Sequence, residues 1–358
     1  MIMSSTEPGQ NRVRIRRVAR GLSQAELALQ AGISRAAVSA IEVNRLVPSV
    51  AAALALATAL ECSVEELFSP KEGIVREKVS RWAWGAPSER GRYWTASVGG
   101  RVHYYPAEAL PLGEIPHDGC GTVASTVAID RLAERTLVMA GCDPAAGLLA
   151  RLYEQTTGYR MLVFSRSSRR ALDLLHQGVV HVAGVHLGTE DQGNAAIVKD
   201  LIAQPTTLVR VASWEDGVAV GSGVSARSVR GVLGGHLSWI GREAGSGARQ
   251  CLDELLSDRP APRRLASDHR GVAEAIRCGW ADAGVCLQLV AEEAGLRFFP
   301  VRTECYDICF KRESEADPRI QSLIRVIQSS DYRRLVDELP GYDARHTGEI
   351  VAVERCDQ

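Results

Sequence analysis

Apolar residues near the start of the chain recur every three or four positions, between short polar stretches. This spacing is typical of amphipathic helices, and it predicts helices at about 10–20, 24–31, 35–42, 49–60 and 64–68. Ser23 and Glu26 have the spacing of a capping box at the start of the second helix. Gly32 supplies the tight turn before the third helix. We therefore expect an all-α domain over residues 8–70.

Beyond residue 136 the apolar positions form short continuous runs that alternate with amphipathic stretches. Strands are predicted at 136–141, 159–164, 179–186, 218–220 and 237–240, and helices at 144–153, 168–176, 247–256 and 269–278. Asp143 is expected to cap the first of these helices, with Pro144 in its first turn. Two such α/β units in succession predict a two-lobed α/β domain around a cleft, over residues 136–358.

The segment 71–135 has a different pattern, in which aromatic residues and valines alternate with glycine, proline and charged residues. Two strands are expected at 92–98 and 101–105, joined at Gly99-Gly100. We therefore expect a connector that carries a β-hairpin, and we assign no function to it.

Charge is distributed unevenly along the chain, although the whole sequence carries a formal net charge of -1. Residues 1–50 contain seven arginines and three glutamates, which gives this region a net charge of +4. A solvated helix face would explain the arginine run, but beside two helices joined by a tight turn the pattern favours contact with DNA phosphates. The helix predicted at 35–42 exposes Arg35, Ala36 and Ser39, whose short side chains and single arginine suit the major groove.

These residues also carry a family resemblance. The segments 21–28, 31–35, 41–42, 44–45, 48–49 and 60–68 together resemble the lambda-repressor-like (XRE) helix-turn-helix family across about residues 10–68. The resemblance implies an operator-binding domain that acts as a homodimer on double-stranded DNA. We expect Arg35 and Ser39 to reach base edges, and Gln24, Asn44 and Arg45 to contact the backbone. The full set expected at the DNA comprises Arg16, Gln24, Ser34, Arg35, Ala36, Ser39, Asn44 and Arg45.

A second resemblance covers roughly residues 136–340. The motifs at 140–145, 178–186, 242–249, 269–276, 279–284 and 304–307 resemble the periplasmic-binding-protein-like domain that is found fused to DNA-binding modules. Members joined to a helix-turn-helix are usually regulators, and related binding proteins carry molybdate, tungstate or phosphate. The resemblance therefore implies a cytoplasmic one-component transcription regulator with a small effector, and no resident cofactor or metal.

The residues predicted at the cleft favour an anion as the ligand. Asp143-Pro144 and Gly245-Ser246-Gly247 each place a helix N-terminus after a strand, where free N–H groups attract negative charge. The string at 242–247 resembles the R-x-x-x-S-G-T motif of phosphate-type binding proteins, but Ala248 stands where that motif has threonine. The missing hydroxyl leaves an organic acid open as the ligand. The expected ligand-binding residues are Cys142, Asp143, Ser165, Ser167, Ser168, His186, Arg242, Ser246, Gly247, Arg249 and Tyr306.

Structural roles compete with these assignments. The glycines could serve close helix–strand packing, Arg242 could pair with Asp282, and Asp143 could act as a helix cap alone. His186, at the end of a strand, has the position of a satisfied structural histidine, whereas Tyr306 is expected near the hinge.

Other functions receive less support. The sequence lacks the G-x-S-x-G, G-x-x-x-x-G-K-[ST], H-E-x-x-H and C-x-x-C motifs, so we expect no enzyme. The G-x-G-x-x-A string at 221–226 is interpreted as a loop. Nine cysteines include the close pair Cys305 and Cys309, which leaves a thiol or redox sensor as an alternative. A second alternative is a small-molecule-binding protein whose helix-turn-helix mediates contact with another protein. No signal peptide or membrane span is predicted.

Overall fold

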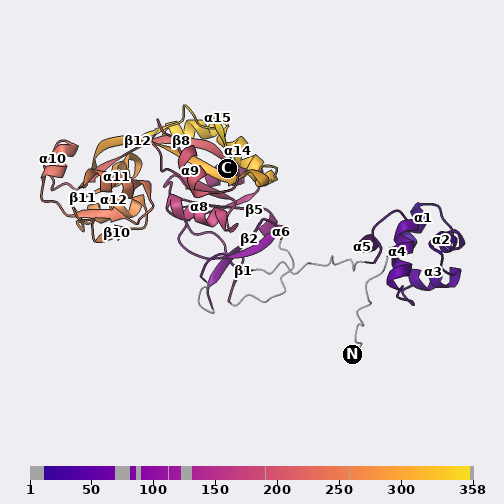
Figure 1. The fold of residues 1–358 in the computed structure, drawn as a ribbon. Helices are drawn as coiled ribbons and strands as arrows, with labels where there is room; N and C mark the ends of the chain where they lie inside the picture. The colour runs from indigo at the N-terminus through magenta and orange to yellow at the C-terminus, as the bar shows by residue number, and fades with distance from the viewer. Residues whose placement is uncertain are drawn as a thin grey trace. The chain divides into compact units, whose positions relative to one another are not determined.

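The computed structural model divides into two compact units, Met1–Lys78 and Val79–Gln358. It describes residues 12–68, 81–85, 90–111, 113–121, 131–189, 191–257 and 259–354 (Figure 1). Among these residues, no helix is long and apolar enough to cross a lipid bilayer.

The first unit consists of short helices packed around one apolar core. They are α1 (Val13–Ala19), α2 (Gln24–Ala31), α3 (Arg35–Glu42), α4 (Val50–Ala59) and α5 (Val64–Phe68). The capping box is confirmed, since the Ser23 hydroxyl accepts from the Glu26 N–H and the Glu26 carboxylate accepts from the Ser23 N–H. Gly32 has a φ of 62°, in the left-handed region that ends α2. Leu27, Val38 and other buried side chains join α1 to α5 in a single core.

The second unit begins with a small sheet of strand order β1-β3-β2-β4. Its strands are β1 (Arg81–Trp82), β2 (Arg92–Val98), β3 (Arg101–Pro106) and β4 (Gly119–Cys120). The expected hairpin is confirmed: Val98 pairs with Arg101, and Gly99 and Gly100 both have positive φ, as a two-residue hairpin turn requires. The hairpin packs on the larger sheet, where the Tyr105 hydroxyl donates to the Val179 carbonyl at 2.7 Å. A short helix, α6 (Arg131–Glu134), leads into that sheet.

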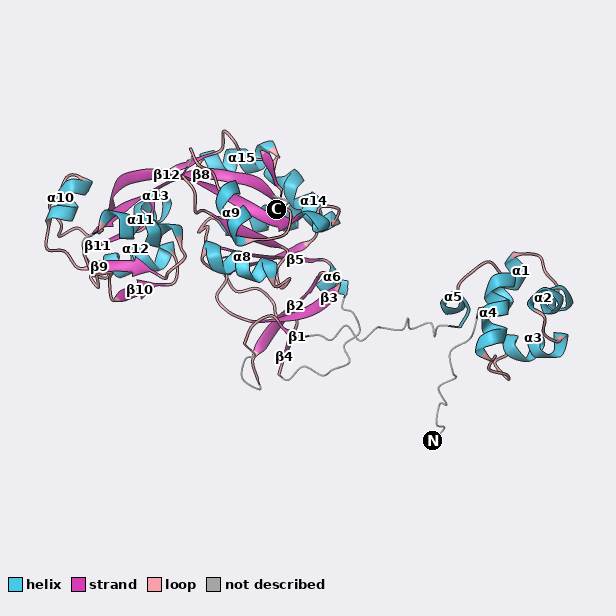
Figure 2. Cartoon of the chain, viewed as in Figure 1, coloured by secondary structure: helices cyan, strands magenta, loops and turns pink. Residues whose placement is uncertain are grey.

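A ten-stranded sheet runs through the rest of the second unit, in the order β10-β9-β11-β8-β12-β7-β5-β6, with β13 and β14 also paired to β8. The first lobe holds β5 (Thr136–Gly141), β6 (Arg160–Ser165), β7 (Val182–Val185), α7 (Ala146–Thr157), α8 (Ser168–His176) and α9 (Ala195–Leu201). The second lobe holds α10 (Val229–Gly234), β9 (Trp239–Arg242), α11 (Gly247–Leu255), β10 (Arg264–Ala266), α12 (His269–Arg277), β11 (Ala283–Leu287) and α13 (Gln288–Glu293). The predicted two-lobed α/β architecture is confirmed (Figure 2).

Two strands of 15 residues each, β8 (Thr206–Val220) and β12 (Arg297–Lys311), connect the lobes. They pair antiparallel along their lengths, while β12 also pairs with β7 and β8 also pairs with β11. The register of β12 shifts between Tyr306 and Asp307, so the strand is irregular where it passes from one lobe to the other. The chain ends on the first lobe with η1 (Arg312–Ser314), α14 (Pro318–Ile327), α15 (Ser330–Asp337), β13 (Tyr342–Asp343) and β14 (Ile350–Val353).

Several expected boundaries need correction. The helix expected from Pro144 begins at Ala146, because Asp143 Oδ1 accepts from the Ala145 N–H at 2.8 Å and holds a turn before the helix. The strand expected at 179–186 begins at Val182. The strand expected at 218–220 is the end of β8, whose remaining residues were not predicted.

Candidate functional site: the α3 surface and the interlobe cluster

The candidate DNA surface lies on α3. The Ser34 hydroxyl caps this helix by accepting from the Ala37 N–H at 3.1 Å. Val38 and Ile41 are buried on one side, whereas Ser34, Arg35 and Ala36 are exposed and Ser39 is half-buried. The helix therefore presents small side chains and one arginine on its outer face, as a helix in a major groove requires.

The flanking residues divide into two groups. Arg16, Asn44 and Arg45 are exposed, and Asn44 ends α3 with a φ of 57°. Gln24 instead donates from Nε2 to Glu42 Oε2 at 2.8 Å. Glu42 is a buried carboxylate that the sequence did not reveal, and it also accepts from Arg17 Nε at 2.6 Å. Burial raises the pKa of Glu42, but hydrogen bonds from Arg17 and Gln24, and the Arg17 charge, bring it below its ordinary value.

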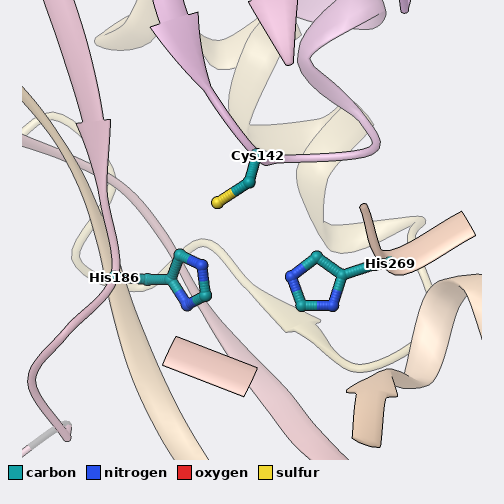
Figure 3. Close-up of side chains that lie close together, drawn as sticks. All are labelled: Cys142, His186 and His269. Carbon is teal, nitrogen blue, oxygen red and sulfur yellow. The ribbon is translucent and has the colours of Figure 1, made fainter. Parts of the chain in front are cut away.

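The candidate ligand site lies between the two lobes. Cys142 follows β5 and His186 follows β7, and because these parallel strands are paired, their carboxyl ends meet at one edge of the sheet. His269 comes from the other lobe, as the first residue of α12. These three side chains are at most 3% exposed, and their possible ligand atoms all lie within 4.8 Å of one another (Figure 3). We call them the interlobe cluster.

Aromatic side chains of the connecting strands line the interlobe cluster. The Trp214 ring of β8 lies 5.1 Å from the His186 ring and stacks on Tyr306 of β12 at 4.5 Å. The rings of His186 and His269 are 5.6 Å apart. Tyr306 thus lies where the sequence placed it, on a strand that joins the lobes.

Several buried polar atoms at the interlobe cluster lack a hydrogen-bond partner. They include Nε2 of His186, both ring nitrogens of His269, Nε1 of Trp214, Nη1 of Arg242, the Tyr306 hydroxyl and both carboxylate oxygens of Asp216. Leaving a buried polar group unpaired costs about 1–3 kcal/mol, so native proteins rarely leave so many in one place. Their convergence indicates a site built for a polar ligand.

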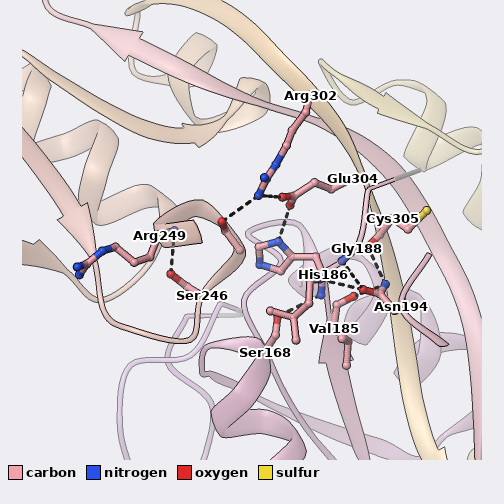
Figure 4. Close-up of polar contacts among 12 residues, drawn as sticks. Ser168, Val185, His186, Gly188, Asn194, Ser246, Arg249, Arg302, Glu304 and Cys305 are labelled. Carbon is pink, nitrogen blue, oxygen red and sulfur yellow. Dashed lines mark hydrogen bonds and ion pairs between the residues drawn. The ribbon is translucent and has the colours of Figure 1, made fainter. Parts of the chain in front are cut away.

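An ion-pair chain fixes the orientation of the His186 ring. Its Nδ1 lies 2.8 Å from Glu304 Oε2, and Arg302 Nη2 lies 2.5 Å from the other Glu304 oxygen (Figure 4). Burial lowers the pKa of His186, but Cys142 and Glu304 raise it above its ordinary value. Burial and the charges of Arg242 and His186 lower the pKa of His269, which is therefore neutral. Glu304, Arg302, His269 and Trp214 were not among the expected site residues.

The segment 242–249, which resembles the R-x-x-x-S-G-T motif, makes contacts that the motif did not predict. Arg242 is 1% exposed, and its Nε and Nη2 each lie 3.1 Å from the Glu243 carboxylate. The alternative Arg242–Asp282 ion pair is wrong, because Asp282 accepts from the Ser238 hydroxyl at 2.6 Å. The Ser246 hydroxyl accepts from the Arg249 N–H and donates to the Glu243 carbonyl, so it caps α11.

Gly247 and Arg249, in the first turn of α11, differ in their surroundings. A Cβ on Gly247 would lie 2.6 Å from His186 Nδ1, so a glycine is needed for α11 to approach the histidine. The Arg249 side chain pairs with Asp253 at 2.8 Å, donates to the Arg242 carbonyl at 3.2 Å and lines a groove of about 530 Å³ together with Ser246.

The remaining expected residues lie in the first lobe. Ser168 positions the interlobe cluster, because its hydroxyl accepts from the His186 N–H at 3.1 Å. Ser167 is buried at the start of α8. Asp143 is buried and accepts from the Tyr342 hydroxyl at 2.7 Å. Ser165 lines a cavity of about 220 Å³ together with Cys142, Asp143 and His269. This cavity opens beside the interlobe cluster and involves both lobes.

Known proteins resemble both units. Residues 149–328 match the family model of the PBP superfamily domain, and residues 13–67 match the Helix-turn-helix model. The Bacillus subtilis "Uncharacterized protein YvgK" is 28% identical over 228 residues, which cover 60% of this chain and 73% of that protein. A Clostridium pasteurianum protein from the 5' region of a ferredoxin 2Fe-2S gene is 32% identical over 93 residues, which cover 25% of this chain and 79% of that protein.

Solved structures of binding proteins resemble the second unit. A tungstate ABC transporter protein from Geobacter sulfurreducens is 15% identical with a TM-score of 0.44, and the match covers 57% of this chain and 98% of that one. A phosphate transport receptor from Vibrio cholerae is 14% identical with a TM-score of 0.43, and the match covers 58% and 99%.

Proposed function

Because the chain belongs to the PBP superfamily and also carries a helix-turn-helix domain, we propose that it is a transcription regulator whose DNA binding responds to a small ligand held between two lobes. The α3 surface reads the operator, and lobe closure on the ligand changes how two such surfaces are presented in a homodimer. The protein works where its operator lies, in the cytoplasm, and it binds its ligand rather than converting it.

The effector we propose is an oxyanion such as molybdate or tungstate. The observation that carries this proposal is the set of buried, unpaired groups at the interlobe cluster, where Arg242 Nη1 and Trp214 Nε1 are N–H donors. Burial and the charge of Glu304 raise the pKa of the nearby Asp216, which disfavours a negative charge on this carboxyl. Donors in a dry pocket hold an anion more firmly than they would in water.

Calorimetric titration of the full chain tests the proposal that the effector is an oxyanion. Molybdate, tungstate, phosphate, sulfate and small carboxylates are added in turn to wild type, Arg242→Ala and the control Arg277→Ala. Arg242→Ala should weaken binding about 10-fold or more, because hydrogen bonds to charged groups contribute about 1.5–3 kcal/mol. Arg277→Ala should bind as wild type does, since that exposed side chain lies near the end of α12 and pairs with Glu274. If the wild-type chain binds no member of the panel, the oxyanion proposal is wrong.

Electrophoretic mobility shifts test the DNA half of the proposal. The full chain should shift DNA from upstream of its own gene, or a sequence selected from random DNA. A chain that binds a small ligand but shifts no DNA would favour the alternative, in which the helix-turn-helix contacts another protein.

A further inference from the structure

We propose that Cys142, His186 and His269 bind one transition-metal ion that prefers thiolate and imidazole ligands, with Zn²⁺ as the representative ion. The inference rests on the proposed function in one respect, that the space between the lobes receives an effector. It adds a second component to that effector, because the metal ion would join the two lobes directly.

The first argument is the identity and position of the three side chains. One thiol and two imidazoles, all buried, place their ligand atoms within 4.8 Å of one another. In a tetrahedral zinc site, bond lengths of about 2.0–2.3 Å put neighbouring ligand atoms about 3.3–3.6 Å apart. Small side-chain rotations would therefore complete the site. Two ligands come from the first lobe and one from the second, so the ion would hold the lobes closed.

The second argument is the hydrogen bonding of the two histidines. His186 has its Nδ1 on the Glu304 carboxylate, which leaves Nε2 unpaired. A carboxylate on the far nitrogen of a histidine is the usual support for a metal-bound imidazole, because it fixes the ring and makes it a better ligand. Both nitrogens of His269 are unpaired although the side chain is fully buried. A buried imidazole nitrogen with no hydrogen-bond partner is a ready metal ligand.

The third argument is charge. A divalent ion that displaces the proton of the Cys142 thiol and a proton of His186 is bound by one thiolate and two neutral imidazoles with a net charge of +1, and Arg242 adds another positive charge beside it. Three protein ligands leave the fourth position of a tetrahedral ion open. An oxygen of the proposed oxyanion would take that position, with Arg242 Nη1 as its second contact. The metal and the anion thus occupy adjoining parts of one site.

Titration of the chelator-treated full chain with Co²⁺ and Zn²⁺, in buffer without any oxyanion, tests the proposal. One equivalent of Co²⁺ should produce a thiolate-to-cobalt absorption band that Zn²⁺ displaces. The band should be lost in Cys142→Ser and weakened in His269→Gln, and unchanged in the controls Cys278→Ser and His176→Gln, whose side chains are exposed. Glu304→Gln should weaken metal affinity about 10–100-fold, because it removes the support of His186.

A second measurement on the wild-type chain avoids any dependence on folding of the variants. The X-ray absorption spectrum of the zinc-bound wild-type chain should show one sulfur and two imidazole nitrogens among the ligands of the ion. Absence of stoichiometric metal binding, a cobalt band that survives in folded Cys142→Ser, or a zinc spectrum without a sulfur ligand would overturn the proposal. Because no oxyanion is present, these results are separate from the calorimetric test above, and either proposal can fail alone.

Discussion

At the scale of single residues, the site depends on groups far apart in the sequence. His186 and Glu304 are 118 positions apart and bond at 2.8 Å. The sequence identified His186, Cys142 and Arg242 because they follow strands or belong to a motif. It could not identify Glu304, Trp214 or His269, since their roles depend on which strands become neighbours. For the same reason, the pairing of Arg17 with Glu42 was not predicted, although the XRE-like motif included Glu42.

Gly247 offers a prediction at this scale. In Gly247→Ala, the new Cβ would lie 2.5 Å from the His186 carbonyl and 2.6 Å from Nδ1, so α11 must move away from His186. Overpacking of this kind costs about 1–3 kcal/mol, and we expect a lower melting temperature and weaker ligand binding. Gly223→Ala is the matched control, because its Cβ would meet no atom within 4 Å. Equal melting temperatures for Gly247→Ala and Gly223→Ala would contradict the close packing of α11 against His186.

At the scale of elements, periodicity predicted the helices well and the long strands poorly. The helices α2, α3 and α12 begin at their expected residues, where the side chains of Ser23, Ser34 and Asp268 cap the first turns; α8 also begins as expected, although Ser167 makes no capping hydrogen bond. The strands β8 and β12 run for 15 residues across both lobes, so their surroundings change along their length. Gly217 and Pro300 also interrupt the strand pattern in sequence, yet they pair within the sheet.

The α3 surface gives a prediction about DNA. Arg35→Ala should cost about 1–3 kcal/mol of specific affinity and relax the preferred sequence, because a base contact is lost. Arg45→Ala should weaken binding about equally on all sequences, since a phosphate contact carries no sequence information. Affinities of both variants for operator and for scrambled DNA distinguish the base contact of Arg35 from the phosphate contact of Arg45. Unchanged affinity and preference in Arg35→Ala would contradict the assignment of α3.

Glu42 gives a prediction about pH. Its pKa is below the ordinary 4.5 in the folded state, so its ionised form stabilises the first unit. That contribution is fully present above about pH 4.5 and is lost as the pH falls through the folded-state pKa. Glu42→Gln should therefore destabilise the first unit at pH 7, and the difference from wild type should shrink below pH 4.5. Calorimetric melts across this range provide the measurement, and a difference that grows toward acid would contradict the account.

At the scale of the whole molecule, the sequence predicted both the helix-turn-helix and the two-lobed domain. A single helix-turn-helix contacts too few bases to stand above non-specific competition. We therefore expect a dimer on two symmetric half-sites about one helical turn, 10–10.5 base pairs, or a multiple of it apart. Sedimentation and footprinting provide the test, and a monomer that protects one asymmetric half-site would contradict it.

The coupling between effector and operator tests the central claim most directly. Fluorescence anisotropy of labelled operator DNA is measured with the full chain for wild type and Arg242→Ala, without effector and with effector at a concentration that saturates wild type but not the variant. We expect the effector to change operator affinity about 5–150-fold in wild type, the usual range of allosteric coupling, and to have little effect in Arg242→Ala. An operator affinity that a demonstrably bound effector leaves unchanged in wild type would contradict the account.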